Sequence, residues 1–294
     1  MRRDDIELIE RVKGLEAGQG LVAGTINTKL SGNQVLCFCD GETIRLMPNA
    51  QDFKRLYDGD KGPNTGGMGA LSPYPFIDET TLNLIKRNIL QKAVDGLYDE
   101  GTPYKGVLYA GIMLTPQGPK VLEFNSRFGD PEAQVILPQL KSDCFEIFSA
   151  CTNGTLAELE PPLWCRRNYF TVSVAVCSGG YPYTFTKGIK ILGLDNPEAL
   201  IDDGDHVHNY IFHAGTMLDS SESEAVETEQ SPTSDGPSFV TSGGRVVHCI
   251  ARRASLELAA REAVRLAEAV TFDGSYFRSD IGSKITKQLM RIIS

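Results

Sequence analysis

Two predicted β-hairpins constrain the fold of this chain more than any other feature of its sequence. Hydrophobic residues alternate over Val35–Cys39 and Thr43–Met47, and Asp40-Gly41 between these runs is a hairpin turn signal. Alternation returns over Gly106–Leu114 and Lys120–Phe124, on either side of a second turn. Because successive side chains of a strand point to opposite faces, each hairpin has a hydrophobic face that another layer must cover.

A helix that can supply this layer is predicted between the two hairpins. Asp78 suits its N-cap, Ile77 and Leu82 have the spacing of a hydrophobic staple, and Gly101 ends it. Its hydrophobic face consists of Leu82, Ile85, Ile89, Ala93 and Leu97.

Two more helices are predicted after the second hairpin. Asp130-Pro131 indicates one that runs towards Leu140, and Ser142 can cap another that Asn153-Gly154 ends. Strands and helices that interleave in this way predict an α/β (α+β) fold.

A second, strand-rich region follows a predicted hinge at Glu158–Leu163. Alternating residues predict strands over Tyr169–Cys177 and Arg245–Ile250, and Ser255 caps what we expect to be the last helix. The stretch 219–238 is acidic and poor in hydrophobic residues, so we expect it to be a disordered surface insertion.

Charge and cysteine usage exclude several classes of protein. With 29 Lys and Arg against 38 Asp and Glu, the net charge is −9, so we expect no nucleic-acid partner. No apolar run approaches the ~18 residues that span a membrane, and no leader-like segment follows the N-terminus. The seven cysteines form no CxxC pair, and His206 with His208 fits a surface loop better than a metal site. We therefore expect a cytoplasmic protein with reduced thiols and no membrane partner.

Glu123, Asn125 and Arg127 form the clearest chemical pattern. On a strand, Glu123 and Asn125 point to the same side, where a carboxylate and an amide oxygen suit Mg²⁺ or Mn²⁺. Arg127, just beyond the strand end, can pair with a phosphate or a carboxylate. The alternative is that Glu123 is a solvent-facing strand acid and Asp130 only a helix cap.

A glycine-rich segment, Gly62–Gly69, has the sequence Gly-Pro-Asn-Thr-Gly-Gly-Met-Gly and follows the charged residues Asp52, Lys54 and Arg55. Glycine costs backbone entropy, so we expect that three glycines in four positions do not serve packing. They suit an anion-binding nest of N–H groups, or a backbone that approaches a ligand closely. A flexible surface loop is the alternative. A second glycine-rich segment, Gly14–Gly20, resembles a phosphate loop but lacks its lysine.

Long strings in this sequence match one enzyme family. The strings are Gln51–Arg55, Asp58–Ala70, Gly106–Gly111 and Lys120–Glu132, with shorter matches as far as Phe272–Gly274. They closely resemble the glycinamide ribonucleotide synthetases (phosphoribosylamine–glycine ligases), which are ATP-grasp ligases of purine biosynthesis. The resemblance is greatest to the animal form, the first part of a trifunctional chain. It implies a partial ATP-grasp domain followed by a small strand-rich C-terminal domain.

The resemblance also implies a reaction and its site residues. The family joins glycine to 5-phosphoribosylamine in de novo purine (IMP) biosynthesis, through a glycyl phosphate formed with ATP. The implied metal ligands for Mg²⁺ or Mn²⁺ are Glu123 and Asn125, and the implied catalytic residues are Arg127, Asp52 and Lys54. The implied substrate-binding residues are Asn64, Thr65, Gly66, Gly67, Met68 and Gly69, and the implied ATP-binding residues are Gly18, Gln19, Gly20 and Arg11.

The sequence departs from the family pattern near its N-terminal end. We expect the family's N-terminal domain and much of its ATP-binding lobe to be missing. This leaves a remnant of that lobe over 1–33, a catalytic lobe over 34–160 and the C-terminal domain over 165–294. Gln19 stands where the family has a loop lysine, and Arg11 aligns with a strand lysine. The alternative function is therefore a catalytically weak or inactive paralogue that acts as a binding partner.

Overall fold

The computed structural model describes residues 33–165, 169–194, 208–219 and 237–293. The chain divides into two compact units, Met1–Asp52 with Ser72–Arg167 and Phe53–Leu71 with Asn168–Ser294. The segment Phe53–Leu71 thus groups with the second unit, although it lies within the expected catalytic lobe in sequence. Both units combine helices with antiparallel strands, so the mixed α/β class is confirmed.

The first unit is built on an antiparallel sheet with the strand order β3–β1–β7–β8, in which β1 also pairs with β2. Its strands are β1 (Asn33–Asp40), β2 (Ile44–Leu46), β3 (Ala50–Asp52), β7 (Lys105–Thr115) and β8 (Gly118–Asn125). Both predicted hairpins are confirmed. In the first, Cys39 pairs with Ile44, and in the second, Thr115 pairs with Gly118.

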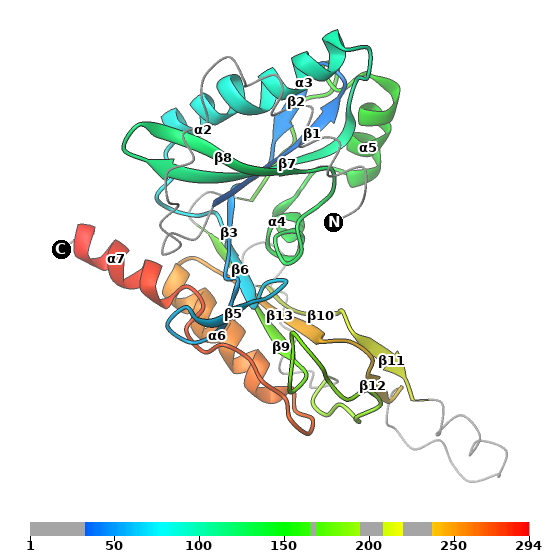
Figure 1. Cartoon of the computed structure of the whole chain (residues 1–294), viewed down its shortest axis with the longest axis vertical. Coiled ribbons are helices and arrows are strands. Elements are labelled where there is room, and N and C mark those ends of the chain that lie inside the picture. Colours follow the sequence, from blue (N-terminus) through cyan, green and yellow to red (C-terminus); the bar gives the residue numbers. More distant parts are fainter. Residues whose placement is uncertain (1–32, 166–168, 195–207, 220–236, 294) are drawn as a thin grey trace, which may run out of the picture. The chain divides into compact units, whose positions relative to one another are not determined.

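Three consecutive helical segments cover one face of this sheet (Figure 1). They are α2 (Glu79–Ile85), the π-helical η1 (Lys86–Leu90) and α3 (Gln91–Asp99). Both predicted ends are confirmed: the Asp78 side chain accepts a hydrogen bond from Thr81 N–H, and Gly101 follows with φ of 74°. The π-helical turn was not predicted, since a hydrophobic period of about 3.6 does not reveal one extra residue.

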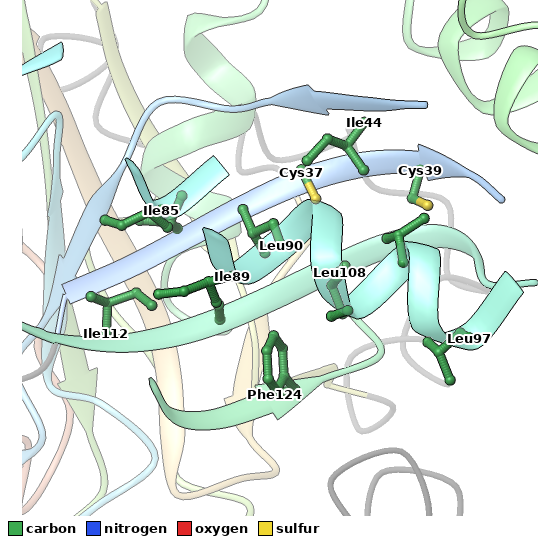
Figure 2. Close-up of a cluster of buried hydrophobic side chains, with 14 residues drawn as sticks. Cys37, Cys39, Ile44, Ile85, Ile89, Leu90, Leu97, Leu108, Ile112 and Phe124 are labelled. Atoms are coloured by element: carbon green, nitrogen blue, oxygen red, sulfur yellow. The ribbon is translucent and has the colours of Figure 1, made fainter. Parts of the chain in front are cut away.

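The core of the first unit lies between this helical layer and the sheet (Figure 2). Its members include Cys37, Cys39, Leu108, Ile112 and Phe124 from the strands, and Ile85, Ile89, Leu90 and Leu97 from the helices. The predicted helix face therefore packs where expected.

Helix α5 (Cys144–Asn153) packs against the opposite face of β1. Phe38, which alternates with the core cysteines, meets Phe148 of α5 edge to face at 5.9 Å between ring centroids. The predicted end of α5 is confirmed by Gly154, with φ of 78°, but the predicted cap is wrong. Asp143 caps α5, while Ser142 Oγ accepts a hydrogen bond from Leu163 N–H.

The helix predicted from Asp130-Pro131 is shorter and begins later. The observed helix α4 (Ala133–Ile136) has Glu132 at its N-cap position and continues into a 3₁₀ turn, η2 (Leu137–Gln139). Asp130 accepts a hydrogen bond from the Gln134 side chain instead of capping the helix.

Strand β8 contains one residue more than the part of β7 it faces. Gly111 pairs with Glu123 and Ile112 pairs with Val121, so Leu122 is the extra residue of a β-bulge. As a result, Val121 and Phe124 both pack against the helical layer although they are three positions apart. Leu122 itself remains 39% exposed.

The larger sheet of the second unit includes β10 (His208–His213), β13 (Arg245–Arg253), β9 (Phe170–Cys177) and β6 (Gly69–Ser72), in that spatial order. Helix α6 (Leu256–Ala269) packs on β9 and β13, and Ser255 caps it by accepting a hydrogen bond from Leu258 N–H. The prediction that α6 is the last helix is wrong, because α7 (Ser283–Ile293) follows it. His208 is also not in a surface loop but is buried in β10.

Two short antiparallel pairs complete the described part of the second unit. They are β4 (Arg55–Tyr57) with β5 (Lys61–Asn64), and β11 (Thr216–Leu218) with β12 (Phe239–Thr241). The glycine-rich segment Gly62–Gly69 therefore begins within a strand, β5. Most of the predicted acidic insertion, residues 220–236, lies outside the described residues. Within the described ranges no helix is long and apolar enough to cross a membrane.

Candidate functional site

Glu123 and Asn125 lie on the same face of β8, as the two-residue period of a strand predicts. Glu123 is opposite Gly111 of β7, and Asn125 is opposite Tyr109. Phe124 points the other way, into the core under α2 and α3 (Figure 2). The hairpin thus presents a carboxylate and an amide together, on the face away from the helical layer.

Gly111 leaves the space that the Glu123 side chain occupies. A Cβ atom at position 111 would lie 3.1 Å from Cγ of Glu123, closer than ordinary van der Waals contact. Any larger residue at this position would push the Glu123 side chain aside. The glycine is therefore explained by the close approach of a side chain across the hairpin, not by a turn.

Tyr109 and Glu132 extend this group, and neither is among the predicted site residues. The Tyr109 hydroxyl donates a hydrogen bond of 3.0 Å to Oε1 of Glu132, and both side chains are buried. Gly129 makes room for this carboxylate, because a Cβ atom there would overlap Oε2 of Glu132. The sequence signal was the Gly-Asp-Pro-Glu string, in which the glycine precedes the glutamate by three residues.

Asp52 belongs to the same acidic neighbourhood. It ends β3, is buried, and its backbone N–H donates to Oε1 of Gln34 at 3.0 Å. Burial, followed by the negative charges of Glu132, Asp52 and Glu123, raises the pKa of Tyr109 far above its ordinary value. The hydroxyl therefore stays protonated and remains a hydrogen-bond donor to Glu132.

The oxygen donors on this face fit one kind of metal site. No group of three or more His, Cys, Asp or Glu side chains in the described ranges is arranged to hold a metal ion. Glu123 and Asn125 instead supply one carboxylate and one amide oxygen, and Asn125 is only 6% exposed. Mg²⁺ is commonly held by one or two protein oxygens together with waters and substrate phosphates. The pair therefore fits a cation shared with a phosphate, and does not fit a closed structural site.

Arg127 lies just beyond the end of β8, as predicted, and its side chain is exposed. Its Nη1 donates a 2.8 Å hydrogen bond to the carbonyl oxygen of Phe128. A guanidinium has five N–H donors, so this one bond leaves it able to bind an anion.

The N–H groups of the glycine-rich segment do not form the predicted anion nest. Thr65 N–H donates to Lys54 O at 2.7 Å, and Gly66 N–H donates to the Tyr181 hydroxyl at 2.9 Å. Gly67 N–H donates to Oγ1 of Thr65 at 3.0 Å, and the N–H of Met68 donates to the carbonyl oxygen of Phe53. Four successive N–H groups thus have partners within the unit, and the nest prediction is wrong.

The prediction that these glycines do not serve packing is wrong for two of them, Gly66 and Gly69. A Cβ atom at Gly69 would overlap the carbonyl oxygen of Ser173, on the neighbouring strand β9. A Cβ atom at Gly66 would lie 3.1 Å from the Tyr181 hydroxyl and 3.3 Å from the guanidinium carbon of Arg245. Arg245 also donates a hydrogen bond of 3.0 Å to Gly66 O. The segment is therefore not a flexible loop but a turn whose backbone is held by hydrogen bonds and close packing, which we call the pinned turn.

Two polar side chains on this turn and its hairpin are exposed. Lys54 is the residue just before β4, and Asn64 is the last residue of β5. The Lys54 carbonyl holds Thr65 in place, by accepting hydrogen bonds from both its N–H and its hydroxyl. The turn thus fixes the backbone and leaves these side chains at the surface of the unit.

Most of the predicted site residues that the structure describes fall into two groups, one in each unit, and Arg127 lies beyond β8 in the first unit. Asp52, Glu123 and Asn125 share one neighbourhood with Tyr109 and Glu132. The other group combines Lys54 with the segment Asn64–Gly69, and its unpredicted members are Tyr181 and Arg245. The predicted ATP-binding residues, Arg11, Gly18, Gln19 and Gly20, lie outside the described residues.

Two profiles of one enzyme family match this chain. The profile of the phosphoribosylglycinamide synthetase ATP-grasp (A) domain matches residues 6–133, and the profile of the C domain of the same enzyme matches residues 171–284. The two matches follow each other in the chain without overlap, and together they include both groups of site residues.

The chain is also similar to two known proteins along most of its length. The bovine trifunctional purine biosynthetic protein adenosine-3 is 47% identical over 269 residues, which are 91% of this chain and 24% of that protein. The phosphoribosylamine–glycine ligase of Caldanaerobacter subterraneus is 43% identical over 249 residues, or 85% of this chain and 53% of that enzyme.

A solved structure supports the same relationship. The crystal structure of phosphoribosylamine–glycine ligase from Thermotoga maritima matches with a TM-score of 0.64 and 31% identity. The match covers 92% of this chain and 63% of that one. The chain thus spans about a quarter of the bovine protein and between half and two thirds of these bacterial enzymes. On the two profile matches and these relatives, the chain belongs to the phosphoribosylglycinamide synthetase family.

Proposed function

We propose that this chain takes part in the ATP-dependent ligation of glycine to 5-phosphoribosylamine, in purine biosynthesis. The observation that carries the proposal is the placement of Glu123 and Asn125 on one face of β8, with Gly111 opposite to admit the carboxylate. A solvent-facing strand acid would not need a glycine across the hairpin. The names of the relatives, a phosphoribosylamine–glycine ligase and a trifunctional purine biosynthetic protein, support the substrate pair.

The proposed chemistry has two steps. The carboxylate of glycine attacks the terminal phosphorus of ATP, which forms glycyl phosphate and releases ADP. The amine of phosphoribosylamine then attacks the glycyl carbonyl carbon, loses a proton and displaces phosphate, which leaves an amide. Both steps build up negative charge on oxygen, so positioning and charge neutralisation account for most of the rate.

Each group of residues has a role in this scheme. Arg127 neutralises the transferred phosphoryl group, and Asp52 and Lys54 orient the reacting groups. The segment Asn64–Gly69 faces the glycine and the sugar amine, while Arg11 and the Gly18–Gly20 segment bind ATP. Glu123 and Asn125 would hold Mg²⁺ or Mn²⁺, which supplies charge neutralisation to the phosphates when bound. Tyr109 holds Glu132, which keeps this buried carboxylate in a fixed position.

The wider context of the reaction is part of the same proposal. We place the reaction in the cytosol, and the trifunctional animal relatives support a chain that also carries other purine-synthesis activities. We keep the domain division into a lobe remnant over 1–33, a catalytic lobe over 34–160 and a C-terminal domain over 165–294 as an expectation.

One observation favours a second function. Gln19 stands where the family resemblance places a lysine that offsets phosphate charge. A chain that binds ATP poorly for this reason would act as a binding partner rather than as a ligase. Turnover of the wild-type chain separates the two functions: a ligase releases ADP as it stands, whereas a chain inactive because of Gln19 gains turnover only with Gln19→Lys.

The direct test measures glycine-dependent release of ADP in the presence of phosphoribosylamine and Mg²⁺. Glu123→Gln removes the charge of the proposed ligand and should lower the rate by about 100-fold or more. Glu146→Gln is the matched control, since Glu146 is an exposed glutamate in the first turn of α5. Equal activity in all three proteins, or none in the wild-type chain, contradicts the proposal.

A further inference from the structure

The hairpin that leads into the glycine-rich segment is held at its tip by residues near the C-terminal end of the chain. Asp58-Gly59-Asp60 joins β4 to β5 and contacts Arg278-Ser279-Asp280. Asp58 accepts hydrogen bonds from the Ser279 N–H at 3.1 Å and the Ser279 hydroxyl at 2.6 Å. Gly59 N–H donates to Oδ2 of Asp280 at 2.8 Å. We call these six residues the tip lock.

Arg278 is the centre of the tip lock. Its side chain is 1% exposed, and its Nε and Nη2 donate to the two carboxylate oxygens of Asp280 at 2.8 and 3.0 Å. Nη2 also donates to Oδ1 of Asp60 at 3.1 Å, and Nη1 donates to the carbonyl oxygen of Arg55 at 3.1 Å. The guanidinium carbon lies 5.5 Å from the ring centre of Phe53. One buried side chain thus contacts the base, the first strand and the tip of the hairpin.

The charge state of the tip lock favours these contacts. Burial alone would raise the pKa of Asp280, but hydrogen bonds from Arg278 and from Gly59 N–H lower it below its ordinary value. Asp280 is therefore ionised and pairs in bidentate geometry with the arginine. The arginine of this pair is buried and Asp280 is partly exposed, so the cost of desolvating the arginine offsets much of their attraction. The pair is therefore better suited to fixing one conformation than to adding stability.

The hairpin tip needs such an anchor because its backbone is unusual. Gly59 has φ of 71°, and Asp60 has φ of 57°, a left-handed conformation that few residues other than glycine, asparagine and aspartate adopt. The tip itself is exposed, so packing does not determine its shape. The hydrogen bonds of the tip to Arg278 and Asp280 therefore hold it in this conformation in place of hydrophobic contacts.

Strand β5 connects the tip directly to the glycine-rich segment, so the position of the tip affects the position of that segment. Asn64 pairs with Arg55, the residue whose carbonyl Arg278 holds. The next residue, Thr65, is bonded to Lys54, and Gly66 begins the pinned turn. None of the tip-lock residues belongs to the predicted site, yet they fix the base and the tip of the hairpin from which the site segment extends.

We propose that Arg278 is a positioning residue: by locking the Asp58–Asp60 tip, it places Asn64–Gly69 to bind glycine or phosphoribosylamine. The proposal rests on the proposed function, in which this segment faces those substrates. ATP is assigned to other residues, so loss of the tip lock should weaken binding of one of the two smaller substrates and leave ATP binding unchanged.

Two variants separate positioning from folding. Asp60→Asn removes one charge from the tip lock and keeps a residue type that tolerates the left-handed backbone, while Arg278→Lys keeps the buried charge and loses the bidentate geometry. Asp273→Asn is the control, because Asp273 is an exposed aspartate outside the tip lock. Amide hydrogen exchange over residues 55–67 reports the order of the hairpin, and initial rates give a KM for each substrate.

We expect faster exchange over 55–67 in both variants, and a KM for glycine or phosphoribosylamine raised about threefold to tenfold, the effect of one weakened charge-assisted hydrogen bond. A smaller folded fraction would lower kcat alone and leave every KM unchanged. Exchange and KM values equal to those of wild type in both variants would overturn the inference, and so would an equal rise in the KM for ATP. If the wild-type chain has no activity, both the proposed function and the role of the tip lock in substrate binding are overturned. The exchange rates then show separately whether the tip lock orders the hairpin.

Discussion

Replacing Gly111 with alanine tests whether the spacing across the β7–β8 hairpin sets the position of the proposed metal ligand. The added Cβ would lie 3.1 Å from Cγ of Glu123, whereas ordinary contacts begin near 3.4 Å. The Glu123 side chain must therefore retreat by about 0.3 Å or more, because the two strands are paired on both sides of this position. The variant changes no polar group, so any effect on metal binding comes from this displacement.

The size of the effect follows from the narrow tolerance of the cation. Mg²⁺ requires oxygen ligands at about 2.0–2.1 Å, with deviations of roughly 0.2 Å tolerated. A displacement of this carboxylate beyond that range should weaken metal binding by about 10- to 100-fold, or roughly 1.4–2.7 kcal/mol. The free energy of unfolding should fall by less than about 1.5 kcal/mol, since the neighbour that yields is a flexible side chain.

The assay combines metal binding with a double-mutant cycle. Mn²⁺ binding in the presence of a non-hydrolysable ATP analogue is followed by the loss of the free-ion paramagnetic resonance signal, and urea unfolding measures stability. Gly111→Ala, Glu123→Gln and the double variant are compared with wild type. If the methyl group acts only by displacing the carboxylate, it costs nothing further once that carboxylate is gone.

Two results would refute this reasoning. Additive losses in the double variant would mean that the methyl group acts through a residue other than Glu123. Unchanged Mn²⁺ binding in Gly111→Ala, with Glu123→Gln impaired, would mean that the glycine does not set the position of the ligand.

Two further predictions concern the second unit. Gly69→Ala should lower the free energy of unfolding by about 2–4 kcal/mol in urea titrations, because the added Cβ would overlap the backbone oxygen of Ser173, which cannot rotate away. A loss of stability smaller than that of Gly111→Ala would contradict the close-packing explanation. A hydrogen bond from Arg265 chiefly lowers the pKa of Glu262, so this group stabilises the fold above its unfolded pKa of about 4.3 and loses that effect as the pH falls through its folded pKa. Glu262→Gln should therefore be less stable than wild type at pH 7, by under about 1 kcal/mol, and should lose less stability between pH 5 and pH 3; parallel pH profiles would contradict this.

Local signals in the sequence predicted most of the first unit. The Asp40-Gly41 turn, the Asp78 cap and the Gly101 stop act through the backbone of their own neighbours, so each can be read without knowing the rest of the fold. The two-residue period also placed Glu123 and Asn125 on one face. The cap predicted at Ser142 was wrong, because Ser142 bonds to Leu163, which is distant in the chain, and Asp143 caps the helix instead.

The missed members of the site depend on contacts that are distant in sequence. Tyr109 meets Glu132 only because the register places Tyr109 opposite Asn125 and the chain then turns back through Gly129. The predicted anion nest failed for the same reason. Its N–H groups are taken by Lys54, Phe53 and Tyr181, and no rule of local spacing assigns those partners.

The bulge at Leu122 has a consequence for how this hairpin can change in length. The part of the hairpin next to the site, from Tyr109 to Gly111, is held by its pairing with β1. Beyond Gly111, towards the turn, the register between β7 and β8 shifts by one residue at Leu122. Lengthening the Pro116-Gln117 turn by a pair of residues would extend the part beyond Gly111 and leave Glu123 opposite Gly111. The tip of this hairpin is therefore suited to accept inserted peptides or genetically encoded labels, close in sequence to the candidate site yet separate from its register.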